Sequence, residues 1–185
     1  MNSLKTRPLS LSEVIEVTPR RFGDHRGFFS EVWSELRFAE AGIGTRFVQD
    51  NVSVSRTKGV LRGLHFQLPP AAQAKLVRVA RGAIFDVAVD VRPRSPTFKR
   101  WAGALLSAEK WNQLFIPEGF AHGFIALEDE TEVNYKVSTP YSPEHERSIR
   151  WNDPSIGIEW PFEGHPVLSE KDERAPLLAD VETGF

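Results

Sequence analysis

The nine residues AIFDVAVDV (83–91) alternate apolar and polar side chains with the period of a β-strand. Phe85 and Val87 lie on one face of this strand, and Asp86 and Asp90 lie on the other. Such alternation is typical of an antiparallel strand with one face in the core and one face in water. The stretch therefore predicts an antiparallel sheet, with the valine face directed into an apolar barrel interior.

Similar short runs recur along the chain, separated by 13 Gly and 13 Pro residues. Many short strands with regular turn signals predict a β-sandwich or a closed barrel. One helix, 35–41, is expected to begin after Ser34 as its cap and to end at Gly42, and to cover the barrel. A shorter helical turn is expected within 169–178. The expected strands are 14–18, 47–55, 60–67, 75–80, 83–91, 100–107, 113–116, 122–126 and 132–138.

Length and composition limit the class of protein. A chain of 185 residues can bury one core, which predicts a single domain over 1–185. The net charge of −2 gives no general attraction to nucleic acid, and no window approaches the roughly 18 apolar residues of a membrane span. The absence of cysteine removes disulfides and thiolate sites and agrees with a cytoplasmic location. Any anion-binding site must therefore be local, such as a basic cluster around a small anionic ligand.

Three predicted strands direct a titratable side chain toward an apolar face. Lys75 and Tyr135 share their faces with valines, and His65 shares its face with Leu61 and Gln67. Each residue alone has a structural explanation, such as a lysine at a strand end or a hydrogen-bonded histidine. Together, a base, a cation and a phenolic acid are the groups required for proton transfer next to a carbonyl. The three residues are therefore candidate catalytic residues.

A metal-dependent cupin enzyme is the alternative from the same residues. PEGFAH (117–122) has the Pro-x-Gly-x-x-His spacing of the second cupin motif, whose histidine is commonly a metal ligand. The first cupin motif requires His-x-His followed by Glu, whereas this chain has His65-Phe66-Gln67 without the glutamate. Two histidines and a glutamine are a poor divalent-metal site. The sequence therefore predicts a cupin-like barrel without a metal.

Seven segments, in this order and spacing, resemble the dTDP-4-dehydrorhamnose 3,5-epimerase family over about residues 14–177. The resemblance implies an all-β, cupin-like jelly-roll barrel (double-stranded β-helix) with a few short peripheral helices. It also implies a homodimer that exchanges strand contacts, no cofactor, and a role in making L-rhamnose for surface polysaccharide. The segments are FGDHRGFFSE (22–31), FVQDN (47–51), GVLRGLHFQ (59–67), AKLVRV (74–79), FDVAVDVRPRSPTF (85–98), LFIPEGFAHGF (114–124) and LSEKD (168–172).

The resemblance further implies an isomerase that converts dTDP-4-dehydro-6-deoxy-D-glucose to dTDP-4-dehydro-L-rhamnose through enolates. His65 would be the base, oriented by Asp172 in a carboxylate–histidine dyad. Lys75 would stabilise the enolate oxygen, and Tyr135 would be the acid on the opposite face. The alternatives are a related enzyme that inverts only carbon 3 and a non-catalytic sugar-nucleotide-binding module.

The remaining residues implied by the resemblance bind the substrate. Where the family has two adjacent aromatic residues, this chain has Pro140 and Tyr141, so Tyr141 or Phe22 would have to stack on the nucleobase. Strand alternation also places Arg62 on the face opposite to His65. Either Gly63 permits a bulge, or Arg62 serves a site shared across a dimer interface, which is the alternative that the resemblance favours. The implied binding residues are Arg26, Glu31, Gln49, Asn51, Arg62, His122, Glu146 and Lys171.

Overall fold

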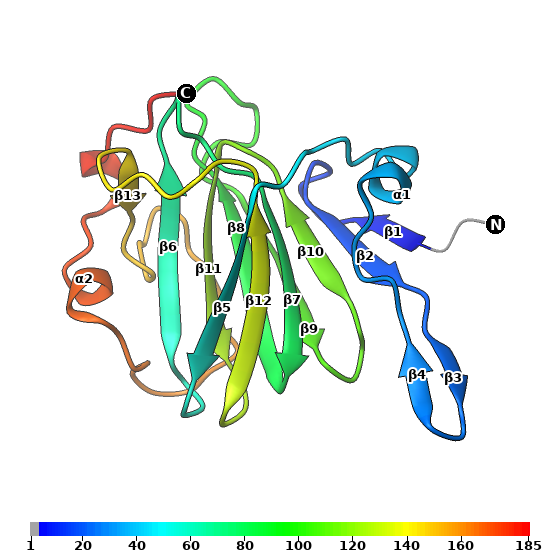
Figure 1. Ribbon diagram of the computed structural model, residues 1–185. Coiled ribbons are helices and arrows are strands. Elements are labelled where there is room, and N and C mark those ends of the chain that lie inside the picture. The colour runs from blue at the N-terminus through cyan, green and yellow to red at the C-terminus, as the bar shows by residue number, and fades with distance from the viewer. Residues whose placement is uncertain (1–3) are drawn as a thin grey trace.

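The computed structural model describes residues 4–185, which form two facing antiparallel β-sheets (Figure 1). The first sheet has six strands, in the order β1 (Leu4–Pro8), β2 (Ile15–Pro19), β10 (Gln113–Ile116), β7 (Lys75–Arg81), β12 (Thr131–Val137) and β5 (Gln49–Ser55). The second has five, in the order β13 (Glu146–Ser148), β6 (Leu61–Gln67), β11 (Phe120–Ala126), β8 (Ala83–Asp90) and β9 (Trp101–Ser107). The predicted all-β, cupin-like jelly-roll barrel is confirmed.

Three apolar clusters hold the sheets and their covers together. The central cluster lies between the two sheets and includes Val77, Ala88 and Leu114. A second cluster joins the five-stranded sheet to the chain after β13, where Val87 and Val89 pack with residues such as Leu178. The third places Phe38 of helix α1 (Glu35–Glu40) against the six-stranded sheet, so α1 is the cover that the sequence predicted.

The predicted orientation of β8 is wrong. Val87 and Val89 face outward into the second cluster, and Asp86, with none of its surface exposed, faces the barrel interior. The physical reason is that the C-terminal chain covers the outer face of this sheet, while part of the interior is a polar cavity. Alternation shows which residues share a face, but it does not show what covers that face.

Most differences from the predicted elements occur at short or exposed strands. Each of the nine expected strands is present, with ends that differ by at most two residues. The sequence did not predict β1, β13 or the hairpin of β3 (Phe22–Asp24) and β4 (Gly27–Phe29), which carry few buried residues. Ser34 occupies the N-cap position of α1 as predicted, but its side chain makes no capping hydrogen bond.

The helical turns after β13 are short. Helix α2 (Glu170–Glu173) begins after Ser169, whose hydroxyl accepts a hydrogen bond from the Asp172 backbone N–H, and a 3-10 turn, η1, follows at Leu178–Asp180. Within residues 4–185, no helix is both long and apolar enough to cross a membrane.

Strand β6 contains a bulge that decides where Arg62 lies. His65 pairs with His122, and Arg62 pairs with Phe124. Between these two pairs the chain advances by three residues along β6 but by only two along β11, so β6 contains one extra residue. Gly63 between them has a φ of +124°, and a Cβ at this position would lie 2.5 Å from the Gly123 Cα, so only glycine fits. The extra residue places both Arg62 and His65 on the lining of one cavity, so the predicted bulge at Gly63 is present.

Candidate active site

A cleft with two lobes runs into the barrel between the two sheets. The large lobe, about 720 Å³, is lined from β5, β6, β7, β11, β12 and the segment before α2. The small lobe, about 320 Å³, is lined partly by Gln49, Asn51 and Tyr141. His65, Lys75 and Tyr135 line both lobes, so the three candidate catalytic residues stand where the lobes meet. The combined size suits a small-molecule ligand.

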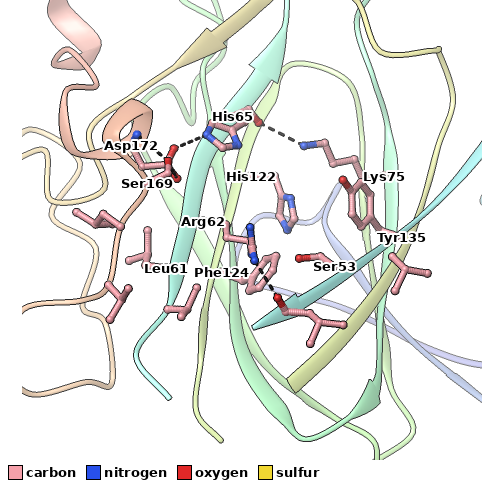
Figure 2. Close-up of a pocket in the computed structure, with 15 residues that line it drawn as sticks. Ser53, Leu61, Arg62, His65, Lys75, His122, Phe124, Tyr135, Ser169 and Asp172 are labelled. Carbon is pink, nitrogen blue, oxygen red and sulfur yellow. Dashed lines mark hydrogen bonds and ion pairs between the residues drawn. The ribbon is translucent and has the colours of Figure 1, made fainter. Parts of the chain in front are cut away.

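His65 and Asp172 form a dyad on the β6 wall of the cleft (Figure 2). His65 Nε2 lies 2.6 Å from Asp172 Oδ1, and the Ser169 hydroxyl donates to Asp172 Oδ2 at 2.9 Å. Burial opposes ionisation of Asp172, but hydrogen bonds from His65, Ser169 and the Gly63 backbone outweigh it and lower the pKa of Asp172. The start of α2 therefore presents an ionised carboxylate to the histidine.

Lys75 is buried where its strand reaches the junction of the lobes. Its side chain is directed toward β6, and Nζ donates to the His65 carbonyl oxygen at 3.4 Å (Figure 2). Burial lowers the pKa of Lys75 from 10.5 to about 8, although the charges of Asp86 and Glu146 favour the ammonium form. The result is a poorly solvated amino group next to His65.

Tyr135 lies on the opposite wall of the cleft from His65, on β12 (Figure 2). Burial raises the pKa of Tyr135, with a smaller opposing effect from Arg62. The phenol is therefore neutral over the ordinary pH range and keeps a proton to donate. His65 and a protonated Tyr135 thus face one another across the cleft.

A second histidine–carboxylate pair includes His122, which lines the large lobe, and the fully buried Asp86. His122 Nε2 lies 2.6 Å from Asp86 Oδ1, and burial, followed by the charge of Lys75, lowers the pKa of His122 despite Asp86. A carboxylate accepts, so Nε2 carries the ring proton and Nδ1 is left as an acceptor. The sequence missed Asp86 because alternation assigned it to solvent. The available signal was the spacing of Asp86 and Asp90, which places two aspartates four positions apart in a valine-rich strand.

The donors of the two cupin motifs do not fit a divalent-metal site. His65 and His122 each direct Nε2 to a carboxylate. The Gln67 amide instead donates to the Ala71 carbonyl and accepts from the Ser142 N–H, at 2.6 and 2.8 Å. Among residues 4–185, no group of three or more His, Cys, Asp or Glu side chains could hold a metal ion.

Several predicted binding residues surround the small lobe. Gln49 donates to Asn51 Oδ1 at 2.8 Å on the inner face of β5. Glu146 lies 2.6 Å from the Lys171 ammonium and accepts a hydrogen bond from the Tyr141 hydroxyl at 3.0 Å. Burial opposes ionisation of Glu146, but these two partners lower its pKa. Tyr141 is 55% exposed, which leaves its ring available to a ligand.

Arg26 and Glu31 lie outside both lobes. Arg26 sits at the turn of the β3–β4 hairpin and pairs with Asp24, and Glu31 pairs with Arg37 at 3.0 Å. The hairpin projects from the β2 side of the barrel, away from β6 and α2 (Figure 1). Phe22 of the same hairpin is exposed and also lies outside the lobes. The chain by itself therefore does not bring these residues to the cleft.

The fold and the cleft together define a cupin-like barrel with a candidate proton-transfer site. A family model described as dTDP-4-dehydrorhamnose 3,5-epimerase matches residues 8–180. The Sinorhizobium fredii (strain NGR234) protein of that name is 51% identical over 185 residues, covering 100% of this chain and 95% of the relative. The Salmonella typhimurium protein is 55% identical over 170 residues, covering 91% and 92%. The chain belongs to the dTDP-4-dehydrorhamnose 3,5-epimerase family, and it is an epimerase.

Solved structures show the same architecture. The Legionella pneumophila epimerase in complex with dTDP-4-keto-L-rhamnose is 46% identical, with a TM-score of 0.92 and coverage of 97% of this chain and 95% of the other. A 3'-monoepimerase from Streptomyces bikiniensis, in complex with dTDP-quinovose, is 39% identical, with a TM-score of 0.87 and coverage of 94% and 87%. The fold is therefore shared by double and single epimerases.

Proposed function

We propose that this chain epimerises carbons 3 and 5 of dTDP-4-dehydro-6-deoxy-D-glucose and forms dTDP-4-dehydro-L-rhamnose. The reaction belongs to dTDP-L-rhamnose biosynthesis, which supplies surface polysaccharide such as O-antigen. The observation that carries the proposal is the placement of His65 and Tyr135 on opposite walls, with the Lys75 ammonium near the base. Inversion of a carbon centre needs a base on one face and an acid on the other.

The chemistry follows from the ketone at carbon 4, which acidifies the hydrogens on carbons 3 and 5. His65 takes one of these protons, and the electrons of the C–H bond move to the carbonyl oxygen to give an enolate. Tyr135 then gives its proton to the same carbon from the opposite face, and the carbonyl forms again. His65 and Tyr135 return to their starting states by exchange with solvent, so each inversion is balanced.

Asp172 and Lys75 support the two proton transfers. The Asp172 carboxylate orients the His65 ring and stabilises the imidazolium that forms when His65 takes the proton. The Lys75 ammonium is poorly solvated in its buried position, so it stabilises the enolate oxygen most strongly as negative charge develops. Both groups act more strongly on the transition state than on the bound substrate.

The lobes suggest how the nucleotide and the sugar divide the cleft. The exposed Tyr141 ring is the aromatic residue of the small lobe that can stack on a nucleobase, in place of the residue at Pro140. Gln49, Asn51 and the Glu146–Lys171 pair supply polar contacts there. The hexose then occupies the large lobe, where His122 Nδ1 and Arg62 can bind its oxygen atoms.

We also propose a homodimer in which the β3–β4 hairpin serves the cleft of the partner. Phe28 and Phe29 on the hairpin are exposed, and so are Val52 and Val54 on the outer face of β5. Exposed apolar groups of this kind mark interaction surfaces. A second copy would cover them and would give Arg26 and Glu31 a role in binding. A cytoplasmic location is proposed from the cysteine-free sequence and is tested by cell fractionation.

A 3-epimerase that inverts a single centre is the second candidate, because a 3'-monoepimerase shares the fold. Incubation of the purified protein with dTDP-4-dehydro-6-deoxy-D-glucose in deuterated water distinguishes the candidates by NMR. Deuterium at both carbons 3 and 5 of an inverted product supports the double epimerase. Deuterium at carbon 3 alone supports the single epimerase, and substrate binding without any exchange supports a non-catalytic sugar-nucleotide-binding module. Activity that is lost on chelation would instead indicate a metal-dependent enzyme.

A further inference from the structure

The inner face of β5 is polar along its whole length, which is unusual for a strand that borders a barrel core. Gln49, Asn51, Ser53 and Ser55 alternate inward, while Val52 and Val54 are exposed on the outer face. Half-buried antiparallel strands normally have the opposite pattern. Gln49 and Asn51 are explained by the small lobe that they line. The two serines need a separate explanation.

Ser53 carries a buried hydroxyl that is directed into the large lobe. Figure 2 shows its oxygen turned into the cavity, on the same side as the Tyr135 ring. Its cross-strand neighbour is Val133, which is buried and has no polar side-chain atom. Ser53 Oγ has no hydrogen-bond partner within residues 4–185. A buried hydroxyl without a partner is unfavourable, so a position that retains one calls for a ligand that satisfies it.

We propose that Ser53 is a substrate-positioning residue whose hydroxyl hydrogen-bonds an oxygen atom of the hexose in the large lobe. This inference rests on the proposed function, because it takes the ligand to be a nucleotide-linked hexose. The reacting carbons of that hexose must lie between His65 and Tyr135, and the rest of the ring extends past Tyr135 toward Ser53. A hydroxyl both donates and accepts, which suits a sugar oxygen in either role.

Such a bond would fix how far the hexose ring enters the lobe. A base and an acid on fixed walls can serve a carbon only when that carbon stands between them, so a contact at the inner end of the ring sets the alignment. Ser53 is therefore expected to contribute to substrate affinity and to alignment, while it takes no proton itself.

Ser55 provides a matched control on the same strand. It shares the inner face with Ser53, it is 1% exposed, and its hydroxyl also has no partner in the described part of the chain. Ser55 does not line either lobe. A substitution at Ser55 therefore makes the same chemical change on the same strand, at a hydroxyl that is also buried and without a partner in residues 4–185, and it does not touch the proposed ligand.

The test compares Ser53→Ala and Ser55→Ala for binding of dTDP and of dTDP-glucose by calorimetry, with KM for the keto-sugar and the melting temperature. We expect Ser53→Ala to weaken dTDP-glucose binding and raise KM by about 5- to 10-fold, with dTDP binding unchanged. Ser55→Ala should leave all binding unchanged. Because the hydroxyl has no internal partner, neither change should lower the melting temperature. Ser53→Cys, which keeps the shape but donates weakly, should behave like Ser53→Ala.

Two results would overturn the inference. In one, both Ser53 variants bind dTDP-glucose like the wild type. In the other, they weaken dTDP and dTDP-glucose binding equally, which indicates an effect on the nucleotide or the fold. A wild-type protein that binds dTDP-glucose through Ser53 but does not epimerise the keto-sugar would refute the proposed function and leave the role of Ser53 intact.

Discussion

His65 and Asp172 are separated by 107 positions in the sequence, yet His65 Nε2 lies 2.6 Å from Asp172 Oδ1. The contact joins the bulged strand β6 to the first turn of α2, where Ser169 caps the helix and also donates to the Asp172 carboxylate. The position of the base therefore depends on a four-residue helix near the C-terminus. This dependence makes Asp172 and Ser169 informative targets.

Asp172→Asn is expected to lower kcat by about 100- to 10,000-fold, because the amide cannot stabilise the imidazolium that forms on His65. Binding of dTDP should stay near the wild-type value, since the amide keeps the shape of the carboxylate. Steady-state turnover and dTDP binding check both statements. Ser169→Ala keeps the Asp172 carboxylate but removes one hydrogen bond to it and the cap of α2, and it should lower kcat by less than 10-fold. A kcat of Asp172→Asn within 10-fold of the wild type would remove the dyad from the mechanism.

Tyr135→Phe is expected to separate proton removal from inversion. His65 can still take a proton in this variant, but the opposite face lacks an acid, so the proton returns to the face that it left. NMR in deuterated water should then show label in recovered substrate, while inverted product falls by about 100-fold or more. His65→Asn is the control and should show neither label nor product. Product formed at the wild-type rate would contradict the assignment of Tyr135 as the acid.

The orientation of single residues was predictable from the sequence where a strand had an unambiguous face. Lys75 and Tyr135 share faces with valines that pack in the central cluster, so alternation alone directed them inward. Asp86 was misplaced because both faces of β8 are buried, one by the barrel and one by the C-terminal chain. The alternation of residues along β8 does not show that the C-terminal chain covers its outer face, because that chain is distant in the sequence.

Other parts of the site depend on contacts that a single sequence does not encode locally. The bulge at Gly63 changes the register of β6 by one residue and brings Arg62 to the same cavity as His65, and Gly63 was the available signal. Ser53 is a small polar residue in a strand that alternates polar residues and valines, so the sequence does not distinguish it from its neighbours. Its proposed role in binding follows from the cavity that it lines and from its hydroxyl, which is unpaired within residues 4–185. The resemblance to a known family suggested Arg26, but the chain alone leaves Arg26 far from the cleft.

The value of kcat/KM, which reports on ionisations of the free enzyme, is expected to fall as the pH rises through about 8, because the buried Lys75 ammonium then loses its charge. Tyr135, whose pKa is raised, stays protonated over this range and does not account for the loss. A profile of kcat/KM against pH checks the prediction. A flat profile between pH 7 and about 10 would show that the charge of Lys75 is not needed.

The stability of the protein should respond to Lys75 in the opposite direction. Lys75 loses its proton near pH 8 when folded, but near 10.5 when unfolded, so the unfolded chain binds more protons between these values. Stability from this group therefore rises with pH in that window, by about 3 kcal/mol at most. Denaturant unfolding of the wild type and Lys75→Met at pH 7.5 and 10 measures the change. The wild type should gain stability relative to the variant, and an unchanged difference would contradict the lowered pKa.

Mixing two inactive variants tests whether the β3–β4 hairpin serves the cleft of a partner. If Arg26 of one protomer contacts substrate bound to the other, Arg26→Ala and His65→Asn should each be impaired as pure proteins. A mixed dimer of the two contains one site with both an intact His65 and an intact Arg26. Its other site lacks both groups.

Exchange of subunits between the two pure proteins should therefore restore activity toward one quarter of the wild-type value, because random mixing gives about half mixed dimers with one complete site each. The control is Arg7→Ala mixed with His65→Asn, since Arg7 pairs with Glu16 on the same chain and belongs to β1 and not to the hairpin. That mixture should show only the average of its two components. Activity of the Arg26→Ala mixture that also equals the average would place Arg26 outside the partner's cleft, and light scattering that shows a monomer would refute the dimer itself.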